Sequence, residues 1–100
     1  MAAKDDYARG IEAAIIAAGQ IQTRARAVCI LAEDSHNSSA LKLAQSAAEA
    51  AELSIRNLQS AILFIDEMDK TTRLSRQGSA SLESSEAELA KAEQALDLIG

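Results

Sequence analysis

Apolar residues recur along the first third of the chain at alternating steps of three and four residues. This spacing keeps them on one side of an α-helix, as in helices that pack against a partner along their length. The stripe runs into small polar residues at 34–39, and no proline interrupts it. The pattern predicts a helix over about residues 5–33. The stripe consists of Tyr7, Ile11, Ala14, Ala18, Ile21, Ala25, Val28 and Ala32.

A second stripe with the same spacing follows the polar run and predicts a helix over about residues 39–70. Ser38 or Ser39 is expected to cap its N-terminus, because a serine hydroxyl can accept a bond from a free backbone N–H there. Together the two stripes predict a long antiparallel helical hairpin. The second stripe consists of Leu41, Ala44, Ala48, Ala51, Ile55, Leu58, Ile62 and Ile65.

A shorter third helix is predicted over about residues 81–99. The apolar stripe fails after Met68, and we expect the chain to break within 70–78. Either the second helix continues on its polar faces to a stop at Gly78, or it ends near Thr71 and a linker follows. Ser85 and Glu88 have the spacing of a capping box, which marks a helix start. The expected fold is therefore all-α: a single domain over 1–100, built as a small bundle that dimerisation could complete.

Composition points to a thin core. The chain is 48% hydrophobic, but much of this is alanine, which contributes little burial, and only two residues are aromatic. Several large apolar residues fall outside the two stripes, where they need another partner. We therefore expect a protein partner, with a homodimer as one form of it. The candidate apolar contacts are Ile16, Ile30, Leu53, Leu63 and Phe64.

The net charge of −5 argues against direct binding to nucleic acid or to an anionic membrane, both of which attract clustered lysine and arginine. Acidic residues gather in two places that could contact a basic partner. We therefore predict a non-enzymatic, acidic helical module that acts by docking on another protein. The acidic candidates are Asp66, Glu67 and Asp69, and Glu86, Glu93 and Asp97.

The alternative function rests on a likeness of profile. In its size, acidity and helical content the chain resembles the small proteins by which bacteriophages inhibit nucleic-acid-guided nucleases of their hosts, the anti-CRISPR proteins. That resemblance implies docking of the acidic faces on a basic nucleic-acid channel, and hence an inhibitor of a nucleic-acid-binding complex.

A second alternative is enzymatic. Arg9 and Arg26 are similar in spacing to the two arginines that small dimeric all-α chorismate mutases place on their long first helix. The resemblance implies a dimeric enzyme that grips a dicarboxylate with these arginines. The chain departs from the family where 34–39 forms a polar run, since the family continues its first helix there into a lysine.

Other chemistry is sparse in the sequence. His36 is the only histidine and lies in the polar run, and Cys29 is the only cysteine and lies among apolar residues, where we expect a buried, inert thiol. We accordingly expect no cofactor, no metal and no catalytic site. The lack of a disulfide, of a signal-peptide core and of a membrane-length apolar stretch leads us to expect a cytoplasmic protein.

Overall fold

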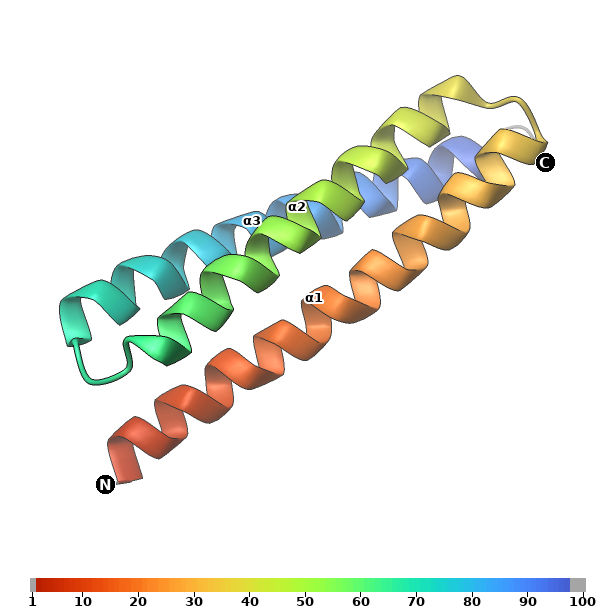
Figure 1. Cartoon of the computed structure of the whole chain (residues 1–100). Helices are drawn as coiled ribbons and strands as arrows, with labels where there is room; N and C mark the ends of the chain where they lie inside the picture. The colour runs from red at the N-terminus through yellow and green to blue at the C-terminus, as the bar shows by residue number, and fades with distance from the viewer. Residues whose placement is uncertain (1, 98–100) are drawn as a thin grey trace.

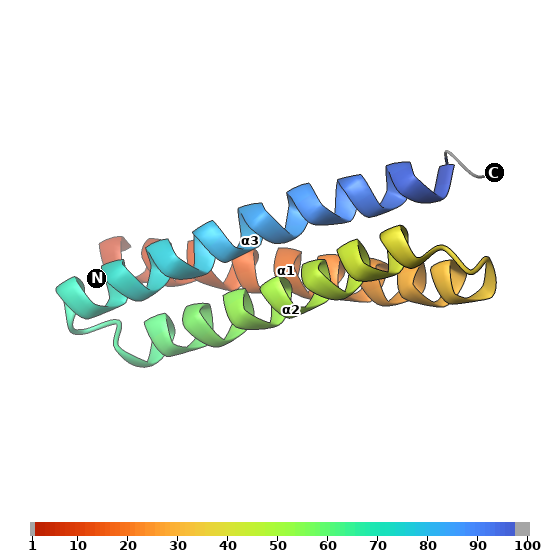
Figure 2. The ribbon, with the colours of Figure 1, turned by 90° about the horizontal axis from the view of Figure 1, so that it is seen from above.

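The computed structural model describes residues 2–97, with side chains from residue 4 onward. It consists of three helices: α1 over Ala2–Asp34, α2 over Ser38–Leu63 and α3 over Met68–Asp97 (Figure 1). Successive helices run in opposite directions, so the N-terminus and the α2–α3 turn lie at one end of the bundle (Figure 1, Figure 2). The bundle is a rod measuring 51 × 18 × 15 Å. The predicted all-α bundle is thereby confirmed.

The predicted stripe of α1 is confirmed as its inner face. Tyr7 and Ala14 are half-buried, and the remaining six members are buried. Ile21, Ala25 and Val28 form one core cluster with alanines of α2, whereas Ile11 joins Leu58 in a second cluster nearer the N-terminus. Apolar periodicity therefore placed this helix correctly along most of its length.

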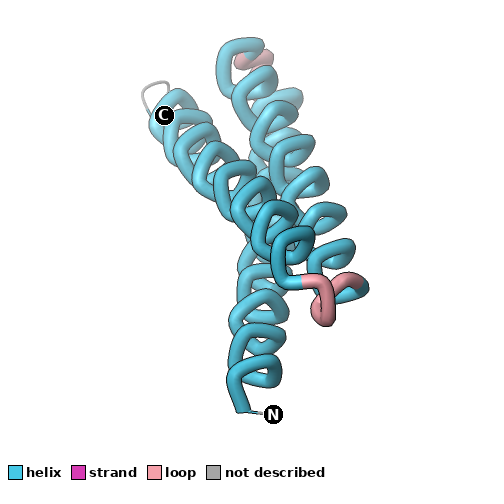
Figure 3. The backbone as a smooth tube through the Cα atoms, turned by 90° about the vertical axis from the view of Figure 1, so that its left-hand side faces the viewer, coloured by secondary structure: helices cyan, strands magenta, loops and turns pink. Residues whose placement is uncertain are grey.

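The buried face of α2 is rotated slightly from its predicted stripe. The predicted Ala44, Ala51 and Leu58 are fully buried, but the other predicted positions are half-buried. Because α2 packs against both α1 and α3 (Figure 3), the centre of its buried face lies between the two neighbours. Residues one position earlier take the deepest places in the core. These residues are Ala40, Ala47, Ser54 and Ala61.

The α1–α2 turn combines a helix stop with a helix start. His36 adopts a left-handed conformation with φ of 54°. Its N–H donates to the Glu33 carbonyl at 3.2 Å, and the Asn37 N–H donates to the Ala32 carbonyl at 2.8 Å. This pair of bonds is the Schellman motif, which usually ends in glycine. Asn37 then caps α2, so the predicted serine caps were wrong.

Asn37 also fastens this turn to the third helix. Its side-chain oxygen accepts a bond from the Ala40 N–H at 3.1 Å. Its side-chain nitrogen donates to the Ala95 carbonyl at 3.1 Å. An asparagine can do both at once because its amide carries an acceptor and a donor, whereas a serine at this place would lack the reach to α3.

The predicted boundaries of the second and third helices were wrong. The α2 helix ends at Leu63, and α3 begins at Met68 and contains 30 residues against 26 in α2. Gly78 lies inside α3 with an ordinary helical conformation, and Ser85 donates to the Leu82 carbonyl within the same helix. The expected stop and capping box are therefore absent from these positions. The predicted end at residue 99 lies outside the described residues.

The chain turns at residues 64–67, before the predicted break at 70–78, because α3 packs a row of small residues against α2. Thr71, Gly78, Ser85 and Ala92 are spaced by seven and are all buried. The Ser54 hydroxyl donates to the Gly78 carbonyl at 2.7 Å, and the Thr71 hydroxyl donates to the Ala61 carbonyl at 2.6 Å. In both pairs, as in Asn37 and Ala95, the residue numbers add to 132. A single antiparallel register therefore runs the length of α2 and α3.

Gly78 marks the tightest point of this contact. A Cβ atom there would lie 2.6 Å from Leu58 Cγ, 2.8 Å from Leu58 Cδ2 and 3.3 Å from the Ser54 carbonyl oxygen. Only glycine allows the two helices to approach this closely. Gly10 differs, because a Cβ atom there would have no atom within 4 Å.

Replacing Gly78 by alanine should lower the free energy of unfolding by about 1–3 kcal/mol, the usual cost of overpacking a core. The matched control is Gly10→Ala, which should raise it by about 0.5–1 kcal/mol because alanine is the better helix former. Urea denaturation followed by circular dichroism measures both. A stabilising Gly78→Ala would contradict the close contact of α2 with α3.

A double-mutant cycle tests whether Leu58 causes this cost. Leu58→Ala should itself cost about 2–5 kcal/mol, as a buried leucine truncation does. In that background Gly78→Ala should cost less than it does alone, because the side chain that it meets has been removed. Equal costs in the two backgrounds would show that Leu58 is not the obstacle.

His36→Gly should stabilise the protein by about 0.5–1 kcal/mol, because a non-glycine residue in the left-handed region carries a steric cost of about 1–2 kcal/mol. Ser35→Gly is the control, since Ser35 lacks a positive φ and its hydroxyl donates to the Leu31 carbonyl. That control should lower stability. Urea denaturation of the two variants checks the difference, and a loss of stability in His36→Gly would refute the role of the turn.

Candidate protein-binding surfaces

Four of the five predicted apolar contacts are exposed to solvent. Leu63 is 80% exposed, Ile16 and Ile30 are each 62% exposed, and Leu53 is 51% exposed. Phe64 is half-buried, and the Lys70 ammonium lies 3.7 Å from the centre of its ring. These residues do not form one site: Ile16 and Ile30 lie on α1, Leu53 lies within α2, and Leu63 and Phe64 lie at the α2–α3 turn.

The α2–α3 turn and the start of α1 lie at the same end of the rod (Figure 1). A hollow of about 390 Å³ is lined by Lys4, Tyr7, Ile65 and Met68. Met68 is 53% exposed, and the exposed Leu63 lies two residues before Ile65. We call this surface the turn-end patch, and its apolar members are Tyr7, Leu63, Ile65 and Met68.

Three apolar members of the turn-end patch are absent from the predicted contacts. Tyr7 and Ile65 belong to the two predicted inner stripes, and Met68 is the residue after which the apolar pattern fails. Tyr7 and Met68 lie far apart in the sequence and meet only because α3 turns back immediately after Leu63. No local pattern could have shown that they are neighbours.

Acidic side chains adjoin the turn-end patch. Asp66, Glu67 and Asp69 are exposed, as are Asp5 and Asp6 next to Lys4 on α1. Lys4 Nζ donates to Asp66 Oδ1 at 2.7 Å. This hydrogen bond, together with the lysine charge, lowers the pKa of Asp66 below its ordinary value. The patch therefore combines exposed apolar atoms with a surrounding group of exposed acidic side chains.

The other predicted acidic residues lie on the C-terminal half of α3, toward the opposite end of the rod. Glu86 and Asp97 are exposed, but Glu93 is held by Arg24, whose Nη2 lies 2.9 Å from Oε1 and 3.1 Å from Oε2. The charge of Glu93 is therefore balanced within the chain. This acidic group offers less unpaired charge to a partner than its sequence suggests.

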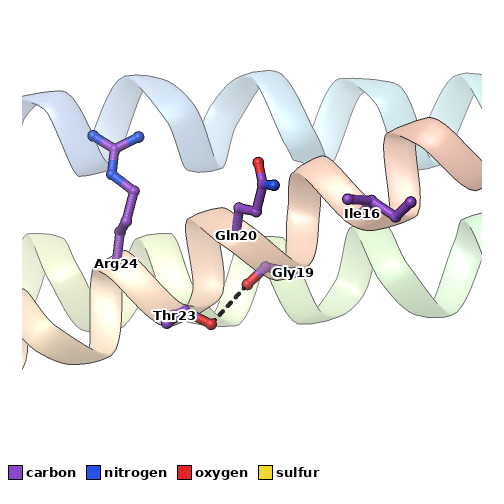
Figure 4. A pocket seen from close by; sticks show the side chains of 5 residues that line it. All are labelled: Ile16, Gly19, Gln20, Thr23 and Arg24. Atoms are coloured by element: carbon purple, nitrogen blue, oxygen red, sulfur yellow. Dashed lines mark hydrogen bonds between the residues drawn. The ribbon is translucent and has the colours of Figure 1, made fainter.

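A second surface lies on the outer face of α1 (Figure 4). A wide, shallow depression of about 530 Å³ is lined by residues of this helix. In Figure 4, Gln20 and Arg24 point toward α3, and the Thr23 hydroxyl donates to the Gly19 carbonyl at 3.1 Å. The depression is lined by Ile16, Gly19, Gln20, Thr23 and Arg24.

The residues considered for catalysis are dispersed. Arg9 and Arg26 are both exposed and lie 17 residues apart on α1, a separation of roughly 25 Å along the helix axis. Such a distance is too long for both to bind one small dicarboxylate on a single chain. His36 is exposed in the α1–α2 turn. Among the described residues, no three histidine, cysteine or acidic side chains lie close enough together to hold a metal ion.

Cys29 is half-buried on α1 rather than fully buried, and it packs against the core cluster that contains Val28. Burial raises the pKa of its thiol, and the nearby negative charge of Glu33 raises it further. The thiol is therefore mostly protonated at neutral pH and is a poor nucleophile.

Comparison with protein-family models, with curated proteins and with solved structures finds no match to this chain. Within the described residues, no helix combines the length and the apolar character that crossing a membrane requires.

Cys29 should react slowly with iodoacetamide, and the midpoint of its pH–rate profile should lie above that of a free cysteine. Glu33→Gln should move the midpoint only part of the way down, since burial is the larger cause. Cys29→Ser combined with Ser39→Cys supplies an exposed control thiol on α2. If Cys29 reacted as fast as that control at neutral pH, its assigned environment would be wrong.

Proposed function

We propose that the protein is a non-enzymatic helical module that binds another protein at the turn-end patch. The partner segment would place an apolar side chain in the hollow beside Met68. Its basic residues would lie against the acidic rim of the patch, which consists of Asp66, Glu67 and Asp69. One observation carries this proposal: exposed apolar residues, a hollow and two carboxylates that form no ion pair with a described side chain, those of Glu67 and Asp69, lie together at one end of the rod.

The apolar part of the patch would supply most of the binding free energy. Full burial of a leucine or methionine contributes roughly 1.5–3 kcal/mol, and the isolated chain leaves Leu63 and Met68 largely in water. Methionine suits such a place, because its flexible side chain adapts to differently shaped partners. Leu63 and Met68 are therefore the residues whose burial should matter most.

The acidic rim would define the chemistry of the partner. Lys4 already pairs with Asp66, whereas Glu67 and Asp69 take part in no ion pair between described side chains. Glu67 and Asp69 are therefore the stronger candidates for contacts with lysine or arginine. Such contacts would mainly speed association and favour basic partners over acidic ones. A basic surface of a nucleic-acid-binding complex, the target of the predicted inhibitor, would fit this requirement.

A displayed library of helical peptides tests the proposal on the full chain. Each peptide carries one apolar anchor, flanked in one half of the library by lysine and arginine and in the other half by aspartate and glutamate. The basic half should be enriched, and selected peptides should lose affinity as salt is added. Leu63→Ser combined with Met68→Ser should weaken them by about tenfold or more.

The matched control is Leu53→Ser, which removes an exposed leucine from α2 outside the patch. It should leave peptide binding unchanged. Glu67→Lys combined with Asp69→Lys should reverse the charge preference without loss of helix content, because both residues are exposed. Failure to enrich any peptide, or equal binding by the patch variant, would refute the proposal.

A further inference from the structure

One charged side chain of the protein already occupies part of the turn-end patch. Lys4 lines the hollow beside Tyr7, Ile65 and Met68, and it is the only charged residue of this lining among the described side chains. Its ammonium donates to Asp66 Oδ1, on the acidic rim, at 2.7 Å. A lysine can contact both because its long aliphatic stem lies along apolar atoms while its charged end reaches a polar partner. Lys4 therefore contacts the two features of the patch that a basic partner would use.

The contact between Lys4 and Asp66 joins distant parts of the chain but is weakly held. Lys4 lies in the first turn of α1, and Asp66 follows 62 residues later in the α2–α3 turn. The two side chains are 51% and 81% exposed. Water and salt screen so exposed a pair, which therefore contributes little to the stability of the fold. A competing cation can displace Lys4 from Asp66 without unfolding the bundle.

Resting on the proposed function, we propose that Lys4 is a built-in competitor for the turn-end patch, which a basic partner must displace from Asp66 in order to bind fully. The ammonium of Lys4 and that of a partner lysine seek the same carboxylate. While Lys4 remains there, it repels the second ammonium and offsets the charge of Asp66. Lys4 therefore lowers the affinity of the patch for basic partners.

The other lysine near this turn cannot take the same role. The Lys70 ammonium lies over the Phe64 ring, 3.7 Å from its centre, and forms no ion pair with a described acidic side chain. Glu67 and Asp69 likewise remain outside the ion pairs of the described residues. Competition within the chain is therefore confined to Asp66, while the other two carboxylates of the rim are open to a first contact.

Titration of a defined peptide into the full chain tests the competitor role. The probe is a fluorescein-labelled helical peptide with one leucine flanked by lysines. Lys4→Met removes the ammonium but keeps an unbranched stem of similar length against the hollow. This variant should bind the probe about two- to fivefold more tightly than the wild type, the range that corresponds to one exposed ion pair. Fluorescence anisotropy measures both affinities.

A double-mutant cycle separates competition at Asp66 from a general effect of charge or apolar surface. Asp66→Asn removes the charge for which the two cations compete, so in that background Lys4→Met should tighten binding much less. Lys42→Met is the matched control. Lys42 is exposed near the start of α2, toward the opposite end of the rod, and forms no ion pair with a described side chain. This variant should leave the affinity unchanged.

The outcomes distinguish this inference from the proposed function. If the wild type binds the probe and Lys4→Met binds it no more tightly, the competitor role is overturned while docking at the patch stands. An equal gain from Lys4→Met in the Asp66→Asn background, or an equal gain from Lys42→Met, overturns the competitor role in the same way. If neither the wild type nor Lys4→Met binds the probe, the proposed function fails and the competitor role fails with it.

The contact itself can be checked without any peptide. Lys4→Met should raise the pKa of Asp66 toward its ordinary value, because the hydrogen bond and the positive charge that lower this pKa are both removed. NMR titration of the Asp66 carboxyl group in the two chains measures the difference. An unchanged pKa would show that Lys4 does not occupy Asp66 and would overturn the proposal.

Discussion

The close contact between α2 and α3 is the constraint on which the rest of the structure depends. At its tightest point Gly78 leaves no room for a Cβ atom beside Leu58, and the Ser54 hydroxyl reaches the Gly78 backbone carbonyl. A buried hydroxyl is costly unless it is hydrogen-bonded, and the Ser54 and Thr71 hydroxyls each donate to a backbone carbonyl on the facing helix. The small residues thus allow the approach, and their hydroxyls fix its register.

The contact of α1 with the bundle is of a different kind. Its inner face packs through isoleucine, valine and alanine, mainly against α2, while the ion pairs Lys4–Asp66 and Arg24–Glu93 connect it to the α2–α3 turn and to α3. These pairs are largely exposed, and such pairs contribute about 0–1 kcal/mol each. The first helix is therefore held on one face, and its opposite face remains available for another contact.

The difference between these two contacts explains which parts of the fold the sequence predicted. The inner face of α1 is built from apolar residues, so its periodicity was sufficient to locate the helix. The facing surface of α3 is built from Thr71, Gly78, Ser85 and Ala92. Threonine, glycine and serine are also typical of turns and helix caps, so an apolar pattern cannot identify them as core. Their seven-residue spacing is the signal that could have placed the turn at 64–67.

The candidate surfaces were also predictable only in part: single exposed residues were predicted, but contacts between distant segments were not. The exposure of Ile16, Ile30, Leu53 and Leu63 followed from their positions outside the stripes. The hollow beside Met68 did not, because it forms between segments that meet only when α3 folds back on α2. Likewise, nothing in the sequence near Glu93 shows that Arg24 balances its charge. Contacts between distant segments depend on the position of the second turn, which was misplaced.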